Sequence, residues 1–297
     1  MTDQLNIEIA GISIRIKCPL NGLSVDSDSA YESFLLPVSN LGSPDIEIDL
    51  KAMNAPYPRF TPYIFDSGQS WSMSRQDDDY YIVYKAPVSD RPVWFAETNG
   101  DFTKITVFCN TDLENYPQET GVIANPVRYP LDQIILMYYL AKRRGILIHA
   151  AGIEIKEKGY IFAGRSGAGK TTISSGFAEK GYTHMLSDDR VIVREMGNAY
   201  RVFGTPWPGE GKISVNRSIP LGGIFFLKHG DTDTVEDVQK HEALELLLPV
   251  ASIPWFDPER IPAMLDFCDR LISHVPAYIL HFRPGTGIVD ALEKFIP

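Results

Sequence analysis

The glycine-rich stretch Gly164–Thr171 combines residue types and a spacing that suit the binding of phosphate groups. Gly164, Gly169, Lys170 and Thr171 fit the pattern G-x-x-x-x-G-K-[ST]. Glycines allow a backbone turn in which successive N–H groups point at one anion. Lys170 adds a positive charge for the outer phosphates, and the Thr171 hydroxyl can ligate Mg²⁺. The stretch therefore predicts a P-loop that binds the phosphates of a nucleotide.

The flanking residues supply the elements that such a loop needs. The apolar run Tyr160–Ala163 predicts a strand before the loop, and a helix is expected from Thr171 to about Lys180. A helix start presents unpaired N–H groups and the positive end of its dipole to an anion. The alternative is a strand–helix turn with an exposed lysine. The residues expected to contact the nucleotide are Gly164, Arg165, Ser166, Gly167, Ala168, Gly169, Lys170, Thr171 and Thr172.

A histidine upstream is predicted to lie beside this loop. Two apolar runs flank the polar turn Lys156–Gly159, and a hairpin with that four-residue loop pairs Ile155 with Tyr160. The same register places His149 opposite Ser166, so an imidazole would lie near the outer phosphates. A register slip would move it. The alternative is a histidine at a strand end with a satisfied hydrogen bond.

Two adjacent carboxylates, Asp188 and Asp189, follow the helix after the loop and the next expected strand. A carboxylate at a strand's carboxyl end near a phosphate loop can hold Mg²⁺ or accept a proton. Neighbouring side chains on an extended chain point to opposite sides, so the two carboxylates are expected to have different roles. The alternative is a solvated acidic turn.

The composition limits the class of protein. The 297 residues are 44% hydrophobic and 22% charged, which is ordinary for a globular protein with a real core. The net charge of −10 argues against a general nucleic-acid binder and against a binder of anionic membranes. The first residues lack the pattern of a signal peptide, and no apolar run approaches the roughly 20 residues of a membrane span. We expect a cytoplasmic protein.

The chain changes character near residues 110–130, and we expect two domains, a β-rich domain over 1–126 and a P-loop domain over 127–297. Isoleucines alternate at positions 7, 9, 12, 14 and 16, and a helix is expected over Ser27–Leu36. The other expected strands span residues 70–75, 80–85, 92–97, 104–109, 221–227 and 277–282, and the other expected helices span 131–141, 242–248 and 258–273.

Three of these features together resemble the HPr kinase/phosphorylase family: His149, the loop Gly164–Thr171, and the sequence Asp188-Asp189-Arg190. The loop is also similar to that of ATP-dependent phosphoenolpyruvate carboxykinase, which shares this architecture. Gly204–Leu227 resembles a later segment of HPr-kinase-like proteins, which include kinases of serine in ribosomally made peptides. The resemblance covers about residues 127–297. It implies an α/β fold in which a β-rich N-terminal domain precedes an HPr kinase/carboxykinase-type P-loop domain.

The resemblance also implies roles for individual residues. Asp188 would be the general base, assisted by His149, with Lys170 as a further catalytic residue. Mg²⁺ would be held by Thr171, Asp189 and Glu210. The chain has Pro208–Lys212 where that family has L-E-I-R-G-x-G, so the resemblance does not extend to HPr as the substrate or to the phosphorylase activity.

The expected function is a Mg-ATP-dependent kinase that transfers the γ-phosphate to a serine hydroxyl of a protein or peptide. A small-molecule kinase, a carboxykinase-like enzyme and a nucleotide-gated binding module are the alternatives. A binding module would need the loop but no base, so the carboxylate pair favours an enzyme. No nucleic acid or membrane partner is expected, and the sequence leaves an oligomer open.

Overall fold

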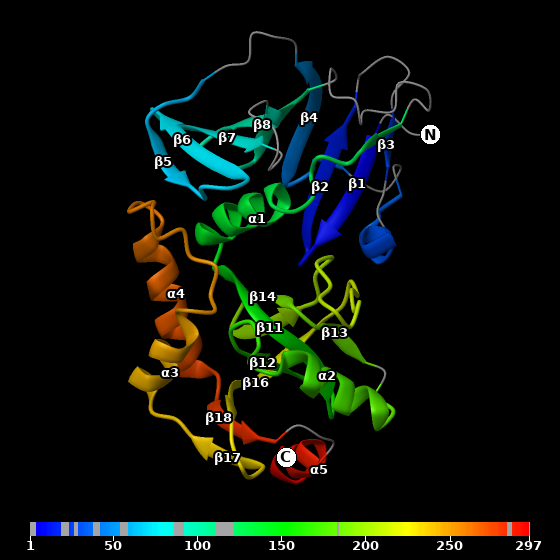
Figure 1. The fold of residues 1–297 in the computed structure, drawn as a ribbon, viewed down its shortest axis with the longest axis vertical. Coiled ribbons are helices and arrows are strands. Elements are labelled where there is room, and N and C mark those ends of the chain that lie inside the picture. The colour runs from blue at the N-terminus through cyan, green and yellow to red at the C-terminus, as the bar shows by residue number, and fades with distance from the viewer. Residues whose placement is uncertain are drawn as a thin grey trace. The chain divides into compact units, whose positions relative to one another are not determined.

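The computed structural model describes residues 4–18, 24–26, 29–37, 42–53, 59–85, 92–110, 122–182, 184–283 and 287–296. Within these ranges the chain is a mixed α/β protein, rich in strands, with two large sheets (Figure 1). It divides into two compact units, one formed by Met1–Tyr139 with Trp255–Asp257, the other by Leu140–Pro254 with Pro258–Pro297. The domain boundary expected at residues 126 and 127 stays a prediction.

An eight-stranded sheet forms the centre of the first unit in the described part of the chain, in the order β1-β2-β4-β9-β8-β7-β6-β5. The alternating isoleucines form the hairpin β1–β2, as expected, because every second side chain is buried. The strands expected between residues 70 and 109 are confirmed to within one residue at each end. The bounds are β1 Gln4–Ile9, β2 Ile12–Lys17, β4 Ile46–Met53, β5 Tyr63–Asp66, β6 Trp71–Gln76, β7 Asp79–Lys85, β8 Pro92–Thr98 and β9 Lys104–Asn110.

The helix expected over Ser27–Leu36 is only a six-residue 3₁₀ helix, η1 (Ser29–Phe34). Leu35 instead forms a β-bridge with Ile7, and this pairing pulls the chain into an extended conformation after Phe34. Ser27 and Asp28 lie outside the described residues. The short strands β3 (Ser24–Asp26) and β10 (Val122–Ala124) pair in parallel.

Helix α1 (Leu131–Ala141) is confirmed with the bounds that its apolar periodicity predicts. In the first unit its Tyr138 ring stacks on Phe102, with ring centroids 4.4 Å apart, and meets Tyr80 edge-on at 5.2 Å. Aromatic contacts of this kind add to the burial of apolar surface that holds a helix on a sheet.

The second unit contains the other large sheet, in the order β12-β11-β14-β15-β16-β18-β17, with β13 on β11 and a further pairing of β12 with β16. Strands β12, β16 and β18 are parallel neighbours, so their carboxyl ends share one edge. In open α/β sheets, ligands bind outside that edge. The bounds are β11 Gly145–Ile155, β12 Lys158–Ala163, β13 Met185–Ser187, β14 Arg190–Met196, β15 Ala199–Phe203, β16 Ser218–His229, β17 Thr234–Asp237 and β18 Ala277–Phe282.

Helices complete the second unit: α2 (Lys170–Glu179), α3 (Lys240–Leu247), α4 (Ile261–His274) and α5 (Gly287–Phe295). The first three match expected helices to within three residues at each end. Helix α5 is not among the expected helices, although its apolar positions recur with helical spacing. Apolar side chains of α2 and α5 form one core with those of the strands beneath them, and this core supports the segment that follows β12.

The hairpin β11–β12 differs from the predicted register by two residues. Its turn contains only Lys156 and Glu157, both with positive φ (48° and 65°), so Ile153 pairs with Tyr160. A two-residue loop with two positive φ angles matches the twist of hairpin strands. Because side chains alternate with a period of two, this shift leaves every side chain on its predicted face.

In the described ranges, no helix combines the length and the apolar character needed to cross a membrane.

Candidate active site

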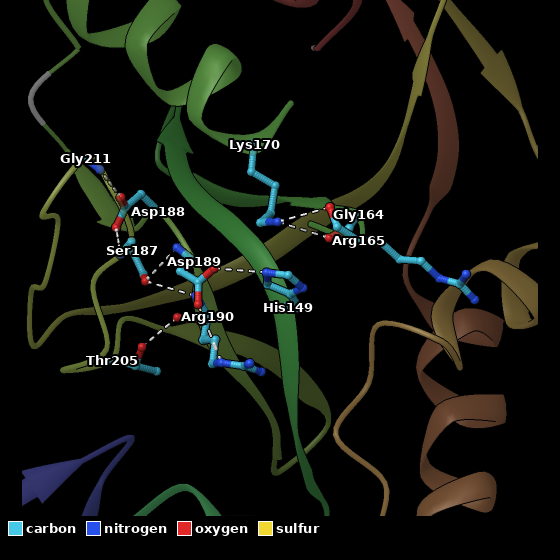
Figure 2. Close-up of polar contacts among 11 residues, drawn as sticks. His149, Gly164, Arg165, Lys170, Ser187, Asp188, Asp189, Arg190, Thr205 and Gly211 are labelled. Carbon is cyan, nitrogen blue, oxygen red and sulfur yellow. Dashed lines mark hydrogen bonds and ion pairs between the residues drawn. The ribbon is translucent and has the colours of Figure 1, made fainter. Parts of the chain in front are cut away.

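The glycine-rich loop, residues 164–171, joins the end of β12 to the first turn of α2 (Figure 2). A Cβ added at Gly164 would lie 2.5 Å from the Cβ of Ala168, and one added at Gly169 would lie 2.3 Å from the Phe282 ring. Gly169 also has a φ of 99°, a conformation that side chains rarely allow. Both positions therefore require glycine. The loop has the preceding strand and the following helix that the sequence predicts.

Lys170 lies almost completely buried where the loop meets α2, with 7% of its surface exposed. Its Nζ atom donates to the carbonyl oxygens of Gly164 at 3.2 Å and Arg165 at 3.3 Å (Figure 2). Burial lowers the pKa of Lys170 below its usual value, and the nearby Asp189 carboxylate opposes part of that effect. The ammonium is therefore held inside the loop by neutral carbonyl groups, which an anionic phosphate can outcompete.

His149 and Asp189 form a direct pair, with 2.9 Å between Nε2 and Oδ1. The backbone fixes both partners, because His149 pairs with Arg190 between β11 and β14, and Ala150 N donates to Asp189 O at 3.0 Å. The two-residue register shift brings His149 opposite Gly164, whose N–H donates to the His149 carbonyl at 3.3 Å. The structure thus places this imidazole at the start of the glycine-rich loop.

Asp189 has an environment that keeps it ionised. Burial by itself would raise the pKa of Asp189, but the hydrogen bond and charge of His149, with the charges of Arg190 and Lys170, bring that pKa below its usual value. The Arg190 Nε atom lies 3.5 Å from Asp189 Oδ2. Figure 2 shows Lys170, Asp189 and His149 pointing toward a common space. The arrangement can neutralise phosphate charge and offers a carboxylate beside it.

Asp188 points away from this space. Its carboxylate accepts three backbone N–H groups, from Gly209 at 2.8 Å, Gly211 at 2.6 Å and Ile213 at 3.3 Å. Only 2% of Asp188 is exposed, whereas 31% of the Asp189 side chain is. The two carboxylates have different surroundings, as expected for adjacent side chains. The partner of His149, however, is Asp189 and not Asp188.

The other expected site residues surround this centre. Arg165 and Ser166 are exposed, and Figure 2 shows the Arg165 side chain directed away from Lys170. Thr171 and Thr172 are half-buried in the first turn of α2, and Glu210 is exposed on the loop that Asp188 bonds. Over the described ranges, no three His, Cys, Asp or Glu side chains form a group that could hold a metal ion by themselves.

Two polar residues at this edge are not among the expected site residues. His229, at the end of β16, lies with its Nε2 atom 3.0 Å from the carbonyl oxygen of Gly167. Ser187 accepts the N–H groups of Asp189 and Arg190 at 3.4 Å each through its hydroxyl, and so supports the turn. A polar residue at the end of an apolar strand is a signal that could have indicated His229.

Comparisons with known proteins find matches to about half of the chain, and the family-model match lies mainly in the second unit. The family model described as SynChlorMet cassette protein ScmC matches residues 129–284. Two proteins named HPr kinase/phosphorylase, from two strains of Leptospira biflexa serovar Patoc, are each 26% identical over 156 residues, covering 51% of this chain and 44% of theirs. The chain thus spans less than half the length of the curated relatives it matches.

Proposed function

This chain belongs to the family described as SynChlorMet cassette protein ScmC, and we propose that it is a Mg-ATP-dependent kinase that phosphorylates a serine hydroxyl of a protein or peptide. One observation carries the proposal. The buried ammonium of Lys170, at the end of the glycine-rich loop, faces the carboxylate of Asp189. The imidazole of His149 holds that carboxylate in place. Phosphoryl transfer depends on such positioning of charge.

The residues of the site suit ATP and Mg²⁺. The glycine-rich loop and the N-terminus of α2 would bind the phosphates, and Lys170 would leave its two carbonyl partners for the outer phosphate oxygens. Thr171 would contribute a hydroxyl oxygen atom, a kind of ligand that Mg²⁺ prefers, with the phosphates supplying further ligands. Glu210, which the sequence suggested as a metal ligand, is exposed on the loop that bonds Asp188 and is not assigned to the metal. When bound, Mg²⁺ neutralises charge that develops on the transferred group.

The geometry favours Asp189, rather than Asp188, as the acceptor of the serine proton. Asp189 is partly exposed and ionised, and its bond to His149 orients Oδ1. The Oδ2 atom, which Arg190 Nε approaches at 3.5 Å, has a further acceptor position for the hydroxyl. Asp188 is buried and already accepts three N–H groups. We therefore assign the role of proton acceptor to Asp189 instead of Asp188, with His149 orienting the Asp189 carboxylate.

Binding of Mg-ATP is expected to raise the stability of the protein. Nucleotide at 100 times its Kd would add about 2.7 kcal/mol to the free energy of unfolding by mass action. Thermal melting with and without Mg-ATP measures this effect. Lys170→Ala should lose the shift, and Lys294→Ala, which removes an exposed lysine from α5, should keep it. Equal shifts in both variants would show that nucleotide binds elsewhere.

Transfer itself is tested by incubating the protein with γ-labelled ATP and two sets of acceptors, serine-containing peptides and small hydroxyl compounds. Label on serine supports the proposal. Label only on a small molecule would replace it with a small-molecule kinase. ATP-dependent capture of a peptide without any transfer of label would instead identify a nucleotide-gated binding module.

A further inference from the structure

Backbone N–H groups from one loop converge on the Asp188 carboxylate. Gly209 and Ile213 donate to Oδ1, and Gly211 donates to Oδ2, at distances of 2.6 to 3.3 Å. An ionised carboxylate has about four acceptor positions, so most of its capacity is used by main-chain groups. Anion-binding groups of successive N–H donors are usually filled by ligands, but here a side chain of the same protein fills one.

The backbone of this loop is folded so that it comes close to the Asp188 carboxylate. Lys212 N donates to Gly209 O at 3.1 Å and closes a tight turn, with a φ of 54° at Lys212. A Cβ added at Gly209 or Gly211 would lie 3.0 or 2.8 Å from Asp188 Oδ2. Glycine at both positions therefore lets the backbone approach the carboxylate. In Figure 2, Gly211 lies against Asp188 to the left of Asp189, and Lys170 lies to the right of Asp189.

Backbone contacts with the end of β13 also hold this loop. Its C-terminal side is joined to β13 by a bridge between Ser187 and Ser214, and Val215 N donates to Leu186 O at 3.3 Å. The side chains of Glu210 and Lys212, between the Asp188 contacts, are both exposed. The Asp188 carboxylate therefore fixes the backbone of a segment whose charged side chains face solvent. Asp188 is the neighbour of Asp189 in the chain, so this contact lies close to the site.

We propose that Asp188 is a positioning residue that anchors the Gly209–Ile213 loop. This loop forms the wall of the site on the side where the phosphate acceptor binds. The nucleotide would lie at Lys170, to the right of Asp189 in Figure 2, whereas Gly211 of the loop lies to the left of Asp189. In-line transfer requires the acceptor hydroxyl and the leaving group on opposite sides of the transferred phosphate. The acceptor-side role rests on the proposed kinase function, whereas the anchoring of the loop does not.

Limited digestion with trypsin tests the anchoring directly, because Lys212 is exposed within the loop. Asp188→Asn keeps the size of the side chain but turns an NH₂ group toward backbone N–H donors. We expect cleavage after Lys212, followed by mass spectrometry, to accelerate about tenfold or more, as loss of a buried charged acceptor predicts. Asp189→Asn is the matched control and should leave the cleavage rate unchanged.

Gly211→Ala provides a second variant that leaves Asp188 intact. Its added Cβ would crowd the Asp188 carboxylate, so the same cleavage should accelerate. The double variant with Asp188→Asn should be cleaved little faster than either single variant, because both break the same contact. Unchanged cleavage in both single variants, with melting temperatures showing folded protein, would overturn the anchoring whether or not the protein is a kinase.

Steady-state kinetics test the acceptor-side role with the peptide that accepts label. Asp188→Asn and Gly211→Ala should raise the acceptor KM several-fold more than they lower kcat, and should keep the thermal shift with Mg-ATP. A fall in kcat of about 10² or more in Asp188→Asn alone, with the acceptor KM and tryptic cleavage unchanged, would make Asp188 the proton acceptor and overturn the proposal.

Discussion

Replacing Asp189 with asparagine is expected to lower the rate of phosphate transfer by about 10²- to 10⁴-fold, the usual contribution of a general base. The asparagine keeps the size of the side chain and can still accept a hydrogen bond from His149, but it takes up no proton. Binding of Mg-ATP should change little, because the loop and Lys170 remain. Single-turnover kinetics with labelled ATP and nucleotide-dependent melting measure the two quantities separately.

The same experiment distinguishes the two roles considered for Asp189. If Asp189→Asn binds Mg-ATP poorly and regains activity at high Mg²⁺ concentration, then Asp189 is a metal ligand, as the sequence alone suggested. Asp188→Asn is the comparison within the pair. Near-normal chemistry in that variant and a large loss in Asp189→Asn would support Asp189 as the proton acceptor.

His149 should act on the pH dependence of the reaction through Asp189. Its hydrogen bond helps hold the pKa of Asp189 below the usual value, so wild-type activity should be kept until acidic pH. His149→Ala removes that influence and raises the pKa of Asp189. The acidic limb of kcat against pH should therefore move to higher pH. An unchanged acidic limb would show that the activity does not depend on this pair.

Local patterns in the sequence predict most of the strands, turns and helices that position the site residues. The strand, loop and helix around Gly164–Thr171 follow from an apolar run, glycine spacing and a helical stretch, all of which are local in the sequence. The face of His149 was also predictable, since the alternation of side chains survives a two-residue error in register. The register differs because Lys156 and Glu157 both adopt positive φ and close a two-residue turn, whereas the sequence predicts a four-residue turn.

The partner of each carboxylate was not predictable from local patterns. Whether Asp188 or Asp189 faces His149 depends on how residues 40 positions apart pair across β11 and the turn before β14. The loop that receives Asp188 lies more than 20 residues further along the chain. Its two glycines were visible in the sequence, but nothing local shows that their N–H groups converge on a carboxylate. Such contacts belong to tertiary structure.

Gly169→Ala is expected to lower the free energy of unfolding by about 2–5 kcal/mol, the sum of backbone strain and overpacking. The added methyl group would meet the buried Phe282 ring at 2.3 Å, in a backbone with a φ of 99°. Because the loop and the start of α2 would have to move, Mg-ATP should also no longer stabilise the protein. Chemical denaturation and melting with nucleotide measure the two effects.

Gly167→Ala is the matched control in the same loop. Gly167 also has a positive φ, 80°, but an added Cβ there would meet no atom within 4 Å. Only the strain remains, so the expected loss is about 1–2 kcal/mol. Gly169→Ala should cost less free energy of unfolding in a Phe282→Leu background than in the wild type. The smaller leucine side chain relieves the clash with the added methyl group, while the backbone strain at residue 169 persists. Equal losses for the two glycine variants, without coupling to Phe282, would mean that the Phe282 ring does not constrain the loop, and that its conformation depends on the backbone alone.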